Sequence, residues 1–355
     1  MRFYGILLYP FACLYGLATA FRNKMFDAGL KKETSFDVPT VVVGNLAMGG
    51  TGKTPMIEFL IRELKEKYGL TVLSRGYGRK TTGFLLANDR HLPRDIGDEP
   101  FQIYQKFGKE VSVAVGEERI LAVPMILANR PGTHLILLDD AFQHRYLKAD
   151  FNILLTTYQN PFFKDSLFPL GTLREARKNA ARAALVIVTK CPENMDGEQR
   201  AYYRKQVSAY VRPGTPVVFT RIKYGTPSVV LAKKRPVSEH VVIVTGIANN
   251  QIFVEEVRSR YNVLEILTFP DHHRYTERDI GQIKRTCSKY VQKDPWILTT
   301  EKDAVKLNDE KFLSLYGEIP IFALPIEVEM EREDRQKVIG MIEQVISKKA
   351  IESGN

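Results

Sequence analysis

The sequence predicts an α/β protein with a parallel sheet covered by helices on both faces, followed by a second, smaller α/β domain. Short apolar runs typical of buried strands alternate with helical patterns along most of the 355 residues. Such alternation produces crossover connections, and these place helices on both faces of a parallel sheet. Proline, glycine and lysine interrupt the alternation between about Arg212 and Glu239. We therefore divide the chain into residues 1–30, 31–215, a hinge or linker at 216–240, and 241–355.

The first element is an apolar N-terminal helix. No charged residue occurs from Phe3 to Phe21, and this length approaches the roughly 20 residues that cross a bilayer. A secretory signal and a buried core helix are alternatives, but we favour a membrane-associating helix that spans the bilayer or lies in its interface. Basic residues that follow would hold the rest of the chain on the cytoplasmic side: Arg22, Lys24, Lys31 and Lys32.

The next element is a glycine-rich loop between a predicted strand, Val41–Val43, and a helical pattern. Its loop amides and the helix N-terminus would face an anion, Lys53 would reach the outer phosphates, and the Thr54 hydroxyl would bind Mg²⁺. The usual motif has glycine where Ala47 stands, so this is a variant loop. It predicts a P-loop NTPase-like domain and argues against export. The residues expected to bind ATP phosphates are Ala47, Met48, Gly49, Gly50, Thr51, Gly52, Lys53 and Thr54.

Further buried strands and a last helix follow in order. Strands are predicted at residues 70–74, 111–115, 135–138, 151–155 and 183–188, then in the second domain at 241–244, 263–269, 296–299 and 319–324. A final amphipathic helix is predicted from about Glu331 to Lys348.

The strand at 135–138 ends on two adjacent carboxylates, Asp139 and Asp140. A carboxylate at this position has the form of a Walker B element, which meets the magnesium held by the loop threonine directly or through water. A helix N-cap is the structural alternative. Because the chain also carries a phosphate loop, we favour the metal role and leave open which carboxylate contacts the ion.

Four clusters of polar residues lie at the predicted carboxyl ends of strands, where ligands bind in such sheets. Taken singly, each has a structural explanation; Thr300 and Asp303, for example, make a capping box. Together they predict a site between the two domains. The clusters are Asp139–Arg145, Pro169–Glu175, Phe269–Tyr275 and Thr299–Asp303.

Seven motifs in this order resemble the tetraacyldisaccharide 4′-kinase (lipid A 4′-kinase) family, from about residue 5 to about residue 325. They are Gly-Gly-Thr-Gly-Lys-Thr-Pro, Ser-Arg-Gly-Tyr-Gly-Arg, Gly-Asp-Glu-Pro, Asp-Asp-Ala-Phe-Gln-His, Leu-Arg-Glu, Asp-His-His and Thr-Glu-Lys-Asp-Ala. The resemblance implies transfer of the γ-phosphate of ATP to the 4′-hydroxyl of an acylated glucosamine disaccharide 1-phosphate, giving lipid IVA in lipid A biosynthesis. It also implies Mg²⁺ and a place at the cytoplasmic face of the bacterial inner membrane.

The same resemblance implies roles for individual residues. Asp98 matches the family's proposed general base, and His272 matches its partner, although His273 is an alternative. Glu175 is expected to assist the metal shell of Thr54 with Asp139 or Asp140. Guanidinium groups pair bidentately with phosphate, which suits the substrate. The substrate candidates are Arg75, Arg79, Arg119, Gln143, His144, Arg145, Arg174 and His273.

The net charge of +10 indicates an anionic partner such as nucleic acid, an anionic membrane surface or a phosphorylated substrate. Basic residues are scattered, so nucleic acid is not expected. Three cysteines without pair or metal spacing fit a reducing compartment. A rival function is that of a regulatory partition-type ATPase, but the signature lysine of that loop would fall at Met48. No obligatory protein partner is evident.

Overall fold

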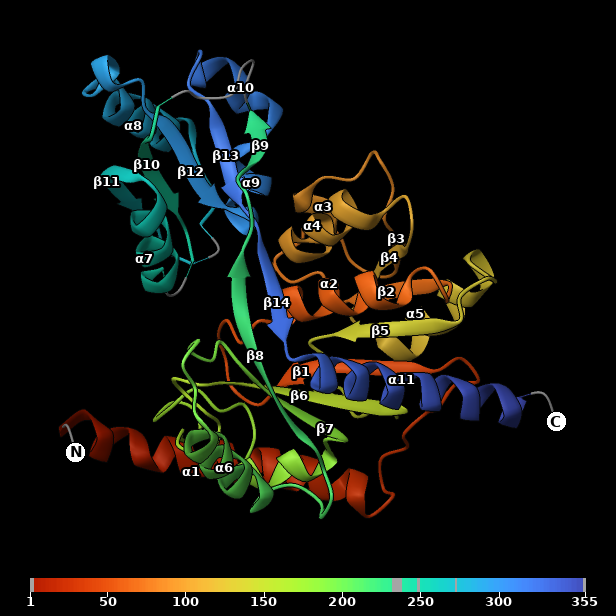
Figure 1. Cartoon of the computed structure of the whole chain (residues 1–355). Coiled ribbons are helices and arrows are strands. Elements are labelled where there is room, and N and C mark those ends of the chain that lie inside the picture. Colours follow the sequence, from red (N-terminus) through yellow and green to blue (C-terminus); the bar gives the residue numbers. More distant parts are fainter. Residues whose placement is uncertain (1–2, 232–237, 248–249, 272, 354–355) are drawn as a thin grey trace.

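The computed structural model describes residues 3–231, 238–247, 250–271 and 273–353, and it confirms the α/β fold with two sheets (Figure 1). Within this part of the chain, nine strands form a larger sheet in the order β14-β8-β7-β6-β1-β5-β2-β4-β3. Their bounds are β1 Thr40–Asn45, β2 Leu70–Ser74, β3 Leu85–Leu86, β4 Ser112–Val115, β5 Leu135–Asp139, β6 Phe151–Thr157, β7 Leu185–Thr189, β8 Val217–Tyr224 and β14 Ile326–Met330.

The larger sheet is parallel except at its two edges, where β3 and β14 run antiparallel to β4 and β8. Both faces are covered because alternate side chains of a strand enter opposite cores. Val41 and Val43 pack with Leu60 in one core, whereas Val42 packs with Phe142 in the other. The helices of this domain are α2 Lys53–Leu64, α3 Pro93–Ile96, α4 Asp98–Phe107, α5 Arg119–Asn129, α6 Gly197–Ser208 and α11 Arg332–Ser353, with a 3₁₀ turn at Arg177–Arg182.

The smaller domain contains a sheet of order β11-β10-β12-β13-β9, parallel except for β9. Its core on one face includes Val242, Ile283 and Phe312. The elements are β9 Ser228–Leu231, β10 His240–Thr245, β11 Asn262–Thr268, β12 Trp296–Thr300, β13 Ile321–Leu324, α7 Gln251–Arg260, α8 Glu277–Ser288, α9 Glu301–Leu307 and α10 Glu310–Tyr316, with a 3₁₀ turn at Val291–Lys293.

The boundaries between the domains differ from those expected. Residues 217–224, assigned to the linker, form strand β8 of the larger sheet, and residues after 325, assigned to the smaller domain, return to the larger one. Val338, Ile342 and Ile346 of α11 pack into a core of the larger sheet. The helical pattern showed that α11 has an apolar face, but periodicity does not say which sheet that face covers.

Helix α1, Phe3–Asp27, lies at the end of the larger domain away from the smaller sheet (Figure 1). One face is held by the protein, with Asn23 and Phe26 buried. The opposite face is apolar and exposed, since Leu14, Leu17 and Phe21 keep 63%, 67% and 67% of their surface accessible. No helix within residues that the structure describes is long and apolar enough to cross a bilayer.

Candidate active site

The phosphate loop connects β1 to α2 and is shaped by two glycines. Gly49 and Gly52 have φ angles of 107° and 87°, values that favour glycine because they bring a Cβ against the backbone. The Thr51 amide donates to the Gly49 carbonyl, and the Asn45 side-chain amide donates to the Thr51 hydroxyl at 2.8 Å. A Cβ added at Gly49 would meet nothing within 4 Å, so the space over the loop is open. The loop therefore has the shape of an accessible cradle.

Two residues after β7 support this loop from the side. The Thr189 hydroxyl donates to the Thr51 carbonyl at 2.8 Å, and the Lys190 ammonium donates to the Gly50 carbonyl at 2.7 Å. Lys190 adopts a left-handed backbone conformation, with φ of 58°. Sequence reasoning did not assign these residues to the site. The signal available was their position at the end of the predicted strand 183–188, at the same edge as the loop.

The carboxylates Asp139 and Asp140 at the end of β5 have different surroundings. Asp139 is buried, the Ser74 hydroxyl donates to its Oδ2 at 3.3 Å, and its Oδ1 has no hydrogen-bond partner among the described residues. Burial, together with the neighbouring Asp140, raises the pKa of Asp139 to about 6. Burial also acts to raise the pKa of Asp140, but Lys53 and Arg174 outweigh it and hold that pKa below its usual value.

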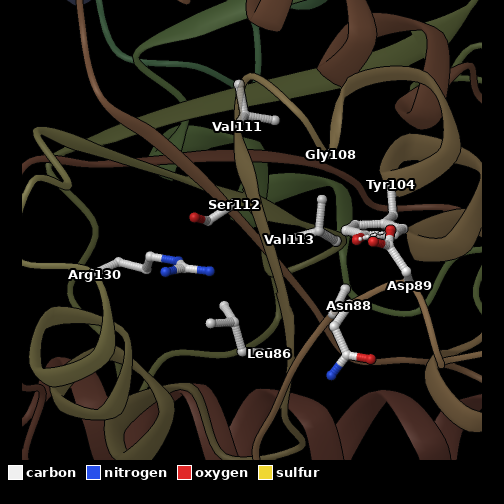
Figure 2. A pocket seen from close by; sticks show the side chains of 10 residues that line it. Leu86, Asn88, Asp89, Tyr104, Gly108, Val111, Ser112, Val113 and Arg130 are labelled. Atoms are coloured by element: carbon white, nitrogen blue, oxygen red, sulfur yellow. Dashed lines mark hydrogen bonds between the residues drawn. The ribbon is translucent and has the colours of Figure 1, made fainter.

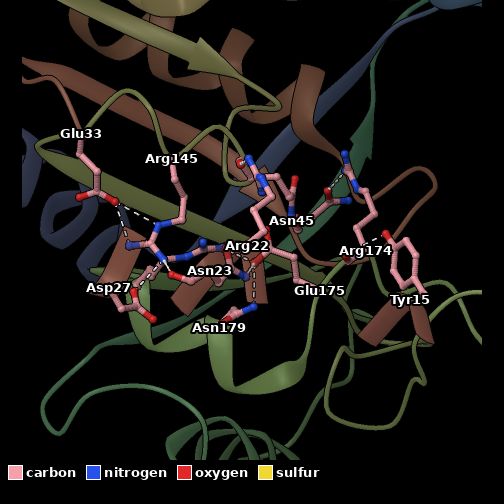
Figure 3. Close-up of polar contacts among 12 residues, drawn as sticks. Tyr15, Arg22, Asn23, Asp27, Glu33, Asn45, Arg145, Arg174, Glu175 and Asn179 are labelled. Atoms are coloured by element: carbon pink, nitrogen blue, oxygen red, sulfur yellow. Dashed lines mark hydrogen bonds and ion pairs between the residues drawn. The ribbon is translucent and has the colours of Figure 1, made fainter. Parts of the chain in front are cut away.

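The structure brings Lys53, Asp140 and Arg174 together at the loop. The Lys53 Nζ lies 3.6 Å from Asp140 Oδ1, and two nitrogens of Arg174 contact the same carboxylate at 2.9 and 3.2 Å. Arg174 also donates to Asn45 Oδ1, and its carbonyl accepts a hydrogen bond from Tyr15 of α1 (Figure 3). The loop lysine, one of the two carboxylates predicted to bind metal, and a guanidinium thus share one network.

Glu175 does not join this network. It is 1% exposed, and its Oε2 accepts hydrogen bonds from Asn23 at 3.1 Å and from Asn179 at 2.8 Å (Figure 3), and from Arg182 at 2.8 Å. Asn23 ties this oxygen to α1, and the other two partners belong to the 3₁₀ turn Arg177–Arg182. Oε1 has no hydrogen-bond partner among the described residues, so a role of Glu175 beside the metal stays a prediction.

Two of the predicted substrate arginines are engaged in ion pairs that hold the fold. Arg79 pairs with Glu117 and donates to the Gly83 carbonyl. Arg145 pairs with Asp27 at 2.7 Å and with Glu33 at 2.8 Å, which fastens the end of α1. Their guanidinium groups have protein partners and are less suited to a substrate phosphate than expected. The remaining arginine of the glycine-rich loop after β2, Arg75, is exposed.

Arg119 contacts the backbone of Asp139, Gln143 contacts Asn45 beside the phosphate loop, and His144 lies near several arginines. Arg119 is 2% exposed, and burial lowers its pKa to about 10, so it stays charged near neutral pH. The Gln143 amide donates to the Asn45 carbonyl at 2.7 Å. Burial, with the nearby positive charges of Arg119, Arg22 and Arg75, lowers the pKa of His144 to about 4. His144 is therefore a neutral imidazole near pH 7.

Asp98 is the first residue of α4 and follows Gly97, whose φ is 95°. Helix α4 packs on β4 of the larger domain and against α9 of the smaller one. From α9, the Lys306 Nζ approaches Asp98 Oδ2 to 3.5 Å, and Lys302 lies 3.4 Å from Glu99 and 3.2 Å from Asp271. The segment that contains the Asp-His-His motif is thus held close to the start of α4.

The two histidines of that motif are placed differently. His272 lies outside the described residues. The ring of His273 is 3.0 Å from Asp279 of α8 and stacks on Phe269. All three side chains are partly buried and belong to the smaller domain, so the ring of His273 is held by its own domain.

Among the residues described, no group of three or more histidine, cysteine, aspartate or glutamate side chains is arranged to hold a metal. A small pocket at the edge of the larger sheet, bordered by Leu86, Asn88 and Tyr104, lies away from the phosphate loop (Figure 2). Tyr104 there donates to Asp89 at 2.8 Å, and the pocket contains none of the predicted site residues.

Comparisons with known proteins point to one family. A family model described as tetraacyldisaccharide-1-P 4′-kinase matches residues 4–347. A tetraacyldisaccharide 4′-kinase of Flavobacterium johnsoniae is 43% identical over 89% of this chain and 91% of its own length, and one of Bacteroides fragilis is 40% identical over 94% and 92%. The crystal structure of the "apo" form of LpxK from Aquifex aeolicus in complex with ATP superimposes with a TM-score of 0.73 and 29% identity, covering 95% of this chain and 99% of that one.

Proposed function

The chain belongs to the tetraacyldisaccharide 4′-kinase family and is therefore a kinase of lipid A biosynthesis, and we propose that its reaction takes place at the carboxyl edge of the larger sheet. The reaction transfers the γ-phosphoryl group of ATP to the 4′-hydroxyl of a tetraacyldisaccharide 1-phosphate, and the product is lipid IVA. The convergence of Lys53, Asp140 and Arg174 beside an open phosphate loop carries this proposal.

Phosphoryl transfer depends mainly on positioning and on charge stabilisation. The loop residues 47–54 would hold the phosphates of ATP, with the Lys53 ammonium on the outer ones. Thr54 and the unpartnered Oδ1 of Asp139 fit Mg²⁺, which prefers hard oxygen ligands, and Asp140 is the alternative carboxylate. When bound, the ion would neutralise charge on the phosphates. The Arg174 guanidinium, held by Asp140 and Asn45, supports this charge arrangement.

The 4′-hydroxyl needs a group that accepts its proton, and Asp98 is our candidate. It lies at the contact between the two domains, where the smaller domain supplies Lys306 and Lys302. His272 remains the proposed partner of Asp98, because its neighbour Asp271 and the neighbour of Asp98, Glu99, contact the same lysine. Pairing across the two domains would form the base only when they are together, which would limit hydrolysis of ATP in the absence of lipid.

The lipid acceptor must be reached from a membrane surface, and α1 provides the face for it. Its outer side chains are apolar, and Phe168, which packs edge-to-face on Tyr15, is 46% exposed beside them. Tyr15 also bonds the backbone of Arg174, so this apolar face is connected directly to the phosphate-loop network. We propose that α1 lies in the interface of an anionic membrane, on the cytoplasmic face where ATP is available.

Two substitutions test the roles of the phosphate loop and of Asp98. Lys53→Ala should abolish transfer of labelled γ-phosphate from ATP to the lipid. Asp98→Ala should lower kcat by about 10²-fold or more while the Kd for ATP, measured by calorimetry, changes less than about threefold. Full turnover in Asp98→Ala would remove it as the base, and full turnover in Lys53→Ala would place the reaction elsewhere.

A further inference from the structure

Lys306 is a buried cation at the contact between the two domains. Its side chain is 8% exposed, and its Nζ has no hydrogen-bond partner among the described residues. The charged groups beside the Nζ are two carboxylates, Asp98 Oδ2 at 3.5 Å and Asp303 Oδ1 at 3.6 Å. A buried ammonium is costly unless it is paired, so these two carboxylates explain why the cation is tolerated there.

The two carboxylates are not equivalent. Asp303 is fully buried in the smaller domain, and its Oδ2 accepts hydrogen bonds from the Gly246 amide and the Thr300 hydroxyl, both at 2.8 Å. The smaller domain holds this carboxylate through Oδ2, whereas its Oδ1 has no hydrogen-bond partner among the described residues and lies 3.6 Å from the Lys306 ammonium. Asp98 belongs to the larger domain, and its side chain is 24% exposed. Lys306 thus contacts a buried carboxylate of its own domain, Asp303, and a more accessible carboxylate of the other domain, Asp98.

The contact is part of an ionic interface between α4 and α9. Glu301 of α9 pairs with Lys106 of α4 at 2.6 Å, and Lys302 of α9 pairs with Glu99 of α4 at 3.4 Å. Glu301 also accepts a hydrogen bond from the backbone of Ile326, at the point where the chain returns to the larger sheet. Helix α9 is therefore anchored at the crossing between the domains, and it carries Lys306 to Asp98 when it lies against α4.

We infer that Lys306 is a positioning residue for Asp98, supplied by the smaller domain; this rests on the proposed role of Asp98 as the base. At 3.5 Å the ammonium attracts the Asp98 carboxylate without donating a short hydrogen bond to it, which leaves the carboxylate able to accept the proton of the 4′-hydroxyl. The base is then aligned only in the arrangement that also closes the α4–α9 interface.

The test combines single and double variants measured in single-turnover kinetics. Lys306→Met keeps the length of the side chain and removes its charge, and it should lower the rate of transfer by about 10- to 10²-fold with KM for ATP within about twofold. Lys306→Arg should restore most of the rate. Lys306→Met should slow Asp98→Ala no further, because the group that Lys306 positions is already absent.

Lys106→Met is the matched control, since it removes a neighbouring ion pair of the same interface that does not involve Asp98. In the double variant, the fold-reduction in rate caused by Lys106→Met should multiply that caused by Asp98→Ala, as expected for independent sites. An unchanged rate in Lys306→Met, or a multiplicative effect of Lys306→Met on Asp98→Ala, would overturn the inference. If Lys306→Met does not fold, Lys306→Gln takes its place. Full activity of Asp98→Ala alone would instead defeat the proposed base.

Discussion

Replacing Glu175 by alanine distinguishes between two roles of this carboxylate, a structural one and that of a metal ligand. The side chain is 1% exposed and accepts three hydrogen bonds on one oxygen, one of them from the Arg182 guanidinium. Breaking a buried ion pair costs about 3–5 kcal/mol, and Arg182, at 20% exposure of its side chain, can recover part of this by contact with water. We therefore expect the free energy of unfolding of the larger domain to fall by about 3 kcal/mol.

The assay uses the single tryptophan of the chain, Trp296, which lies in β12 of the smaller sheet. Urea unfolding followed by far-ultraviolet circular dichroism reports both domains, whereas the fluorescence of Trp296 reports the smaller one. Glu175→Ala should move the dichroism transition to lower urea and leave the fluorescence transition in place. Glu175→Gln, which keeps one acceptor oxygen, should lose about half as much. An unchanged stability with a higher Mg²⁺ requirement for activity would refute this reasoning and return Glu175 to the metal shell.

Three further predictions concern the loop, a histidine and α1. Asn45→Ala removes a hydrogen bond from the Thr51 hydroxyl and one of the partners of Arg174, so the Kd for ATP should rise about tenfold in calorimetry. An unchanged Kd would contradict the support assigned to Asn45. The pKa of His144 is lower in the folded than in the unfolded protein, so the free energy of unfolding should fall as the pH drops below about 6.5, by about 1 kcal/mol at pH 5 after discounting for solvent screening. His144→Gln should remove this loss in urea titrations. An equal loss in the variant would contradict the prediction. Replacing Leu14, Leu17 and Phe21 by glutamine should weaken binding to anionic vesicles at least tenfold in sedimentation. The control Leu121→Gln, at a position on α5 that is 61% exposed, should not weaken binding. Equal binding by both variants would place the membrane contact elsewhere.

Most strands of the fold could be predicted because each is a short, mostly apolar run bounded by polar residues, glycine or proline. The pairing of β14 with β8 could not, since Ile326 and Tyr224 are partners across about a hundred residues of intervening domain. A signal was nevertheless present. Residues 326–330, Ile-Glu-Val-Glu-Met, alternate strictly between apolar and acidic side chains. This pattern is typical of a half-exposed edge strand.

The sequence predicted site residues well where one motif carries the chemistry. It predicted them less well where a role depends on the direction in which a side chain points. Lys53 and Asp140 follow from their positions after β1 and β5, and the structure brings them together. Arg174 and Glu175 are adjacent in sequence, yet one contacts the phosphate-loop network and the other the helix α1. Sequence spacing does not determine which way each side chain points. Lys306 was missed because its partner Asp98 lies in the other domain, and no local pattern links the two.

We propose that the phosphate loop serves phosphoryl transfer to a sugar hydroxyl of a lipid. The most direct measurement follows labelled γ-phosphate from ATP to a tetraacyldisaccharide 1-phosphate in detergent micelles, beside the same lipid without its 4′-hydroxyl. We predict one labelled lipid for each ADP formed with the first acceptor, and no labelled lipid with the second or with Lys53→Ala. Release of labelled inorganic phosphate at the same rate with both acceptors would show an ATPase and contradict the account.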